Sequence, residues 1–103
     1  MKTELPAVQQ LTGGDALVES LKVHGVDTVF ALPGAQIYGL TDALARNADS
    51  IRTLGARHEQ TSAYMAFGYA RSSGRPGVFS VVPGPGILCL LYTSDAADEE
   101  DSV

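Results

Sequence analysis

The feature that most constrains the fold is a regular alternation of β-forming runs with segments of helical character. The β-forming runs are short, and they lie at residues 27–32, 51–56 and 77–82. A helical segment precedes each of them, at residues 12–25, 37–48 and 59–74. Strands that alternate with helices of this length usually form a parallel sheet. The sequence therefore predicts an α/β domain, with a parallel sheet and flanking helices.

The first helical segment carries signals at both of its ends. Thr12 stands three residues before Asp15, which is the spacing of a capping box. Gly25 follows the segment and is expected to end the helix.

The charge of the chain is concentrated in its last residues. The formal net charge is −5, from 12 acidic and 7 basic residues in a chain of 103. All the basic residues lie within residues 1–88, where the acidic residues balance them, and the excess of acid lies within residues 89–103. No basic patch indicates a nucleic-acid partner. No apolar run is long enough for a transmembrane helix, and no signal peptide begins the chain. We expect a cytoplasmic protein with no membrane or nucleic-acid partner.

Unusual residues follow each predicted strand. The segments after the strands read "PGAQ" at residues 33–36, "RHEQ" at 57–60 and "PGPG" at 83–86. Ligands of parallel α/β sheets bind beyond the carboxyl ends of the strands. The three segments are therefore expected to share one rim and to form the functional site, with "PGPG" as a tight turn.

Glu59 is the acidic residue of this rim. Burial against an alanine-rich helix would favour its protonated form, whereas the helix N-terminus would favour its anion. Glu59 could instead serve only as a helix-start carboxylate. The neighbouring His58 is expected to be structural rather than catalytic.

Three stretches together resemble a known domain. "FALPGAQIYGLTDAL", "RHEQTSAYMAFGYARSSGRPGV" and "VPGPGIL" are similar to the N-terminal pyrimidine-binding domain of thiamine diphosphate-dependent enzymes. The branch is the one that contains acetolactate synthase, pyruvate oxidase and benzoylformate decarboxylase. The resemblance covers residues 12–88, about half of such a domain, and so implies an incomplete three-layer α/β/α fold.

The resemblance implies a role for each matching residue. Glu59 would be catalytic: it would hydrogen-bond N1′ of the cofactor's aminopyrimidine and promote the imino tautomer that removes the C2 proton. Leu32, Pro33, Gly34 and Pro85 would line the pyrimidine pocket. The implied function is that of a lyase, decarboxylase or carboligase acting on a 2-oxo acid.

The resemblance also implies what lies outside this chain. Ligands for Mg²⁺ and the diphosphate would come from another domain, so no metal ligand is expected here. A homodimer or tetramer is implied for the complete enzyme, the chain alone is expected to be inactive, and FAD binding is undetermined.

The sequence departs from the family at a few positions. Ala31 replaces a common Gly, Val82 and Pro83 replace small hydroxyl residues, and Cys89 replaces an Asn. From Cys89 the resemblance stops, and "CLLYTSDAADE" resembles one reading frame of a sequencing-library adapter. We therefore expect a leader at residues 1–11, the partial domain at 12–88 and a non-native tail at 89–103.

Two other functional classes remain open from the sequence. The chain could be a stand-alone α/β nucleotide-binding module, or an inactive homologue with a regulatory role. The presence of Glu59 argues against an inactive homologue.

Overall fold

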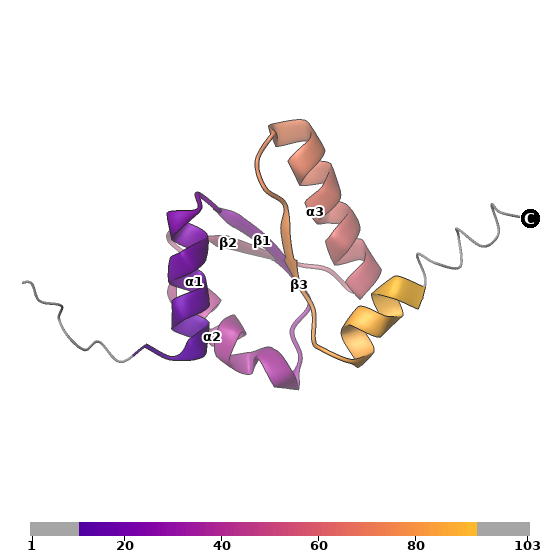
Figure 1. Ribbon diagram of the computed structural model, residues 1–103, viewed down its shortest axis with the longest axis horizontal. Coiled ribbons are helices and arrows are strands. Elements are labelled where there is room, and N and C mark those ends of the chain that lie inside the picture. Colours follow the sequence, from indigo (N-terminus) through magenta and orange to yellow (C-terminus); the bar gives the residue numbers. More distant parts are fainter. Residues whose placement is uncertain (1–10, 93–103) are drawn as a thin grey trace, which may run out of the picture.

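The computed structural model describes residues 11–92 as three strands and their flanking helices (Figure 1). The elements in chain order are α1 (Gly13–Val23), β1 (Thr28–Ala31), the 3₁₀ helix η1 (Ala35–Ile37), α2 (Tyr38–Arg46), β2 (Arg52–Gly55), α3 (Glu59–Ser73) and β3 (Val78–Ser80). Residues 85–92 form a further helical segment. Most of the predicted leader, and residues 93–103 of the predicted tail, lie outside the described residues.

The three strands form one parallel sheet with the order β2-β1-β3. β1 is central: Phe30 pairs with Leu54 on one side and with Phe79 on the other. The parallel α/β fold predicted from the alternation is confirmed.

Helices cover both faces of the sheet (Figure 1). α1 and α2 pack together on one face, where the core contains apolar side chains of both helices, of β1 and of the loops, namely Val18, Val26, Val29, Ala31, Ala43, Leu44 and Ile51. α3 lies on the other face, where Tyr69 meets Phe30 edge-on with ring centroids 5.9 Å apart. This alternation of β1 side chains between two apolar layers makes β1 the most buried strand.

The predicted ends of α1 are confirmed. The Thr12 hydroxyl accepts a hydrogen bond from the Asp15 N–H at 3.1 Å, and the Asp15 carboxylate accepts one from the Thr12 N–H at 3.4 Å. The helix ends at Val23, and Gly25 adopts a positive φ of 78° two residues later. A residue with a side chain adopts this conformation only with strain.

The "PGPG" segment is not the simple tight turn that the sequence indicated. Residues 83 and 84 form a turn, but a helix begins at Pro85. Proline is well suited to the first helical position, because its fixed φ fits the helix and the N–H that it lacks would have no partner there. The Gly-Pro pattern thus marks the start of a helix.

Among the described helices, none is long and apolar enough to cross a membrane.

Candidate functional site

The carboxyl ends of the three strands meet at one rim, as the sequence predicted. The Leu32 N–H, directly after β1, donates to the carbonyl of Ser80 at the end of β3 at 3.0 Å. On the other side, the Ala56 N–H after β2 donates to the carbonyl of Ala31 at 3.4 Å. These bonds extend the sheet to its rim and fix where each following segment leaves it.

Glu59 is the first residue of α3 and is half-buried. Its neighbour His58 is the N-cap, and the His58 Nδ1 accepts a hydrogen bond from the Gln60 N–H at 3.2 Å. The expected structural role of His58 is confirmed by its cap.

The segments that follow β1 and β3 converge beside Glu59. A Cβ placed on Gly86 would lie 3.5 Å from the Glu59 Cγ and 2.8 Å from the Val82 Cγ2. A Cβ placed on Gly34 would overlap the Val82 Cγ1. Both glycines are therefore required by close packing, and this packing brings the three segments expected at the rim into one site.

The residues predicted to line the pocket differ in exposure. Leu32 and Gly34 are half-buried, whereas Pro33 and Pro85 are exposed. Pro85 precedes Gly86, on which a Cβ would lie 3.5 Å from the Glu59 Cγ. Two of the four predicted residues therefore expose surface to solvent at this rim.

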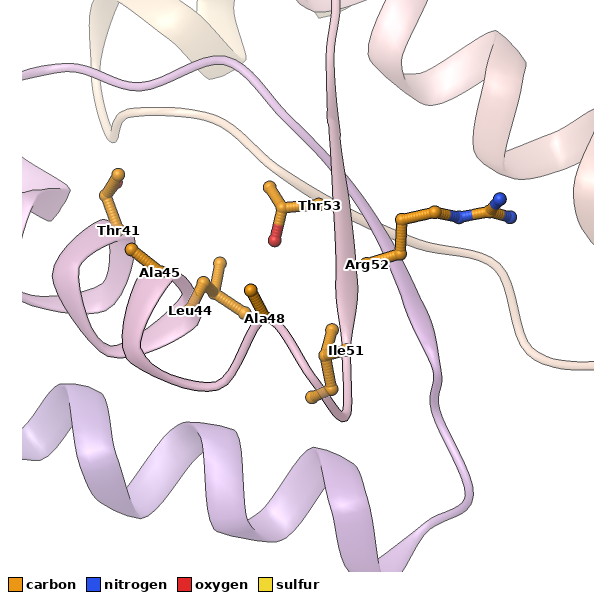
Figure 2. A pocket seen from close by; sticks show the side chains of 7 residues that line it. All are labelled: Thr41, Leu44, Ala45, Ala48, Ile51, Arg52 and Thr53. Atoms are coloured by element: carbon orange, nitrogen blue, oxygen red, sulfur yellow. The ribbon is translucent and has the colours of Figure 1, made fainter.

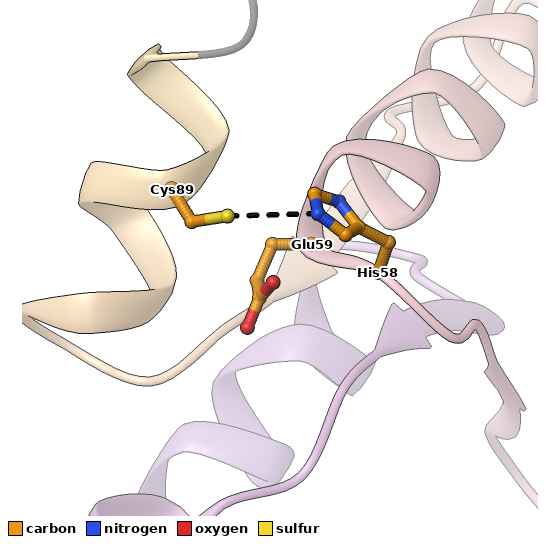
Figure 3. Close-up of side chains that lie close together, drawn as sticks. All are labelled: His58, Glu59 and Cys89. Atoms are coloured by element: carbon orange, nitrogen blue, oxygen red, sulfur yellow. Dashed lines mark hydrogen bonds between the residues drawn. The ribbon is translucent and has the colours of Figure 1, made fainter.

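A thiol and an imidazole lie beside Glu59 (Figure 3). The Cys89 Sγ, on the helix that begins at Pro85, is 3.5 Å from the His58 Nε2. Ligand atoms of His58, Glu59 and Cys89 all lie within 4.8 Å of one another. Imidazole nitrogen, carboxylate oxygen and thiolate sulfur are ligand types that bind zinc.

The cap at His58 opposes metal binding in this conformation. Because Nδ1 accepts the Gln60 N–H, the neutral ring carries its proton on Nε2 and donates toward the Cys89 sulfur. A metal at Nε2 would need that nitrogen's lone pair and would move the proton to Nδ1, which would break the cap. The observed hydrogen bonds therefore favour an imidazole–thiol contact over a metal centre.

The hydroxyl of Ser62 lies one helical turn after Glu59. Ser62 is fully buried, and its Oγ has no hydrogen-bond partner among the described residues. An unsatisfied buried hydroxyl destabilises the folded state.

The pocket between α2 and β2 is separate from this rim (Figure 2). Its volume is about 320 Å³, and it is lined by Thr41, Leu44, Ala45, Ala48, Ile51, Arg52 and Thr53. It lies toward the amino end of β2 and has no carboxylate, His or Cys in its lining. It therefore supplies no acid or base for the chemistry expected at Glu59.

Asp27 anchors α3 and the loop after it at the amino end of the sheet. Its carboxylate accepts hydrogen bonds from the Tyr69 hydroxyl at 2.7 Å, from Thr28 at 3.1 Å and from Arg75 at 2.7 Å. The hydrogen bond from Tyr69, then that from Thr28, and the nearby charge of Arg75 lower the pKa of Asp27. This cluster is structural, because it lies at the end of the sheet opposite Glu59.

Sequence reasoning predicted Glu59, Gly34 and Pro85 as site residues but did not predict the contacts of Val82 and Gly86. The sequence did show that Val82 departs from the small hydroxyl residue of the family. That departure, close to glycines in the sequence, was the one sign that Val82 makes unusual contacts.

Comparison with known proteins decides the family. A profile of the family described as "Thiamine pyrophosphate enzyme, N-terminal TPP binding domain" matches residues 11–93. The chain belongs to this family. The match favours the thiamine diphosphate reading over a stand-alone nucleotide-binding module.

Curated relatives support the branch that the motifs indicated. The chain is 49% identical over 83 residues to the chloroplastic acetolactate synthase of Arabidopsis thaliana, an alignment that covers 81% of this chain and 12% of the relative. It is 49% identical over 77 residues to the probable 2-ketoarginine decarboxylase of Pseudomonas aeruginosa, an alignment that covers 75% of this chain and 13% of the relative. It is 33% identical over 102 residues to the acetolactate synthase large subunit of Mycobacterium tuberculosis, an alignment that covers 99% of this chain and 18% of the relative. The chain thus spans less than a fifth of the length of these relatives.

Proposed function

We propose that this chain is the aminopyrimidine-binding part of a thiamine diphosphate-dependent enzyme that acts on a 2-oxo acid, as an acetolactate synthase-like carboligase or decarboxylase. The observation that supports this most directly is the position of Glu59. Glu59 is the first residue of α3, the helix that follows β2, and its side chain lies against the segment after β3.

The residues at the rim fit the cofactor's aminopyrimidine. A carboxylate can accept a hydrogen bond from a protonated ring nitrogen or donate one when it is itself protonated. Pro33 and Pro85 are exposed on the segments after β1 and β3 and offer apolar surface at the same rim. When bound, thiamine diphosphate supplies a thiazolium C2 that becomes a nucleophile on losing its proton. The contribution of Glu59 is to hold and exchange the proton at the ring nitrogen that promotes this loss.

Other groups of the reaction are proposed to come from outside the described residues. Glu59 is the carboxylate of the rim, and Mg²⁺ needs several oxygen ligands in octahedral geometry. We propose that the Mg²⁺ and diphosphate ligands belong to a further domain of a neighbouring subunit in a homodimer or tetramer. We propose a cytoplasmic location, although the name of the Arabidopsis thaliana relative places that protein in the chloroplast.

The test of this function is the turnover of the full-length protein that carries this domain. Glu59→Gln keeps the shape of the side chain but removes the acid, and we expect turnover to fall about 10²–10⁴-fold, the usual contribution of general acid–base catalysis. Glu19→Gln is the matched control, because Glu19 is exposed on α1 and its carboxylate lies 3.2 Å from the Lys22 ammonium, away from the rim. Unchanged turnover of the Glu59→Gln protein would refute the assignment.

We also propose domain limits of 12–88 for the partial pyrimidine-binding domain, 1–11 for the leader and 89–103 for a non-native tail. The resemblance of the tail to an adapter and its excess of acid support this proposal. Long-read sequencing of the source DNA across codon 89 tests it. A frame that continues with an Asn codon supports a non-native tail, and DNA that encodes the printed tail contradicts it.

A further inference from the structure

Val82 lies where the segments of the site meet. A Cβ on Gly34 would overlap its Cγ1, and a Cβ on Gly86 would lie 2.8 Å from its Cγ2. The Val82 carbonyl also accepts the Ile87 N–H at 3.2 Å. One half-buried side chain thus contacts both the loop after β1 and the first turn of the helix that begins at Pro85.

This set of contacts reaches Glu59. The same Cβ position on Gly86 is 3.5 Å from the Glu59 Cγ. Val82 therefore packs against Gly86, and Gly86 packs against Glu59. Neither glycine has a side chain, so the two γ-methyl groups of Val82 occupy the space between their backbones. Closely packed backbones transmit a change in volume as a shift in position. A β-branched side chain is suited to this role because its χ1 angle is stiff.

We propose that Val82 is a positioning residue for the aminopyrimidine site. Its γ-methyl groups set how closely the Gly34 loop and the Pro85 helix approach the carboxylate of Glu59. The inference rests on the proposed function, because the site whose width Val82 sets is the one assigned there to the cofactor. This role depends on the shape of the Val82 side chain and not on its polarity.

The first experiment compares three variants of the 103-residue chain by NMR titration with thiamine. Val82→Ala removes both γ-methyl groups, and we expect the Kd for thiamine to rise about tenfold or more, since small displacements in a site are costly. Val82→Thr keeps the shape and should stay within about threefold of the wild type. Val78→Ala is the control: Val78 is a Val on β3, four residues before Val82, and it packs against the core. It should lower the free energy of unfolding without changing the Kd.

The second experiment is a double-mutant cycle read by urea unfolding. Gly34→Ala alone forces a methyl group against the Val82 Cγ1, whereas in the Val82→Ala background that atom is gone. The two changes should be coupled by about tenfold in the unfolding equilibrium constant, or about 1.4 kcal/mol. The same variants in the full-length protein give a further measurement, in which Val82→Ala raises the Kd for thiamine diphosphate and Val82→Thr does not.

The outcomes separate this inference from the proposed function. Additive effects in the cycle, a Val82→Thr loss as large as that of Val82→Ala, or an equal loss in Val78→Ala would each overturn the positioning role. If the wild-type chain and the full-length protein bind no thiamine compound while the cycle is coupled, the proposed function fails and the packing contact stands.

Discussion

At the scale of single residues, chemistry and packing are divided among neighbours on α3. Glu59 carries the proposed chemistry, His58 caps the helix, and Ser62 is buried one turn later with an unpartnered hydroxyl among the described residues. The family resemblance implied the role of Glu59, and a structural role was expected for His58. The small size of Ser62 was consistent with close packing of this helix, but the sequence could not show that its hydroxyl is left without a partner among the described residues.

Ser62→Ala is expected to stabilise the chain. The change removes the unsatisfied hydroxyl and leaves a side chain of nearly the same size, so the free energy of unfolding should rise by about 1–3 kcal/mol. Urea unfolding of the 103-residue chain measures this. A loss of stability would show that the hydroxyl has a partner beyond the described residues.

Asp27 is expected to make the free energy of unfolding depend on pH, and the direction of that dependence follows from its pKa. Its pKa is lowered in the folded state, first by the hydrogen bond from Tyr69, then by that from Thr28 and by the charge of Arg75. The unfolded state therefore takes up the proton first, and the stabilisation is complete above the unfolded pKa of about 3.9 and lost as the pH falls below it.

Asp27→Asn tests this sign. The difference in unfolding free energy between wild type and variant should be largest near neutral pH and should shrink as the pH falls below about 4. Asp49→Asn is the control, because Asp49 is an exposed residue of the turn before β2. A difference that stays constant with pH would contradict the role of Asp27.

At the scale of elements, the order of helices and strands could be predicted, but the close contacts between them could not. The alternation of β-forming and helical segments predicted the parallel sheet, and Thr12 and Gly25 predicted the ends of α1. The helix at Pro85 was missed because Pro and Gly signal both turns and helix starts. On α3, Tyr64 and Phe67 are 56% and 63% exposed, whereas Tyr69 packs against Phe30 and the small residues Ser62 and Ala66 are buried.

The packing of α3 on β3 depends on a glycine at the turn into the strand. A Cβ on Gly77 would overlap the carbonyl oxygen of Ala66 and would lie 3.3 Å from the Ala70 Cβ. Gly77→Ala is expected to push α3 from the sheet and to cost about 1–3 kcal/mol of unfolding free energy, as overpacking does.

Gly68→Ala is the matched control for Gly77→Ala. A Cβ there meets nothing within 4 Å, and alanine favours the helix by about 1 kcal/mol. The two variants should therefore shift the urea midpoint in opposite directions, and equal shifts would contradict this account of the packing.

At the scale of the whole molecule, the described residues form one rim of a site. The rim brings together Glu59, Gly34 and Pro85 as the strand-end rule predicted, because parallel strands direct all three following segments to one edge. Val82 and Gly86 could not be assigned in advance, since their contact depends on how two loops approach each other. The remaining groups of the reaction are proposed to lie in further domains.

The most direct test of the central claim is the exchange rate of the C2 proton of thiamine diphosphate, measured by NMR after mixing with D₂O in the full-length protein. We expect Glu59→Gln to slow this exchange about 10²-fold or more, while Glu19→Gln leaves it unchanged. Exchange at the wild-type rate in the Glu59→Gln protein, with the cofactor bound, would contradict the assignment of Glu59 as the residue that activates the cofactor.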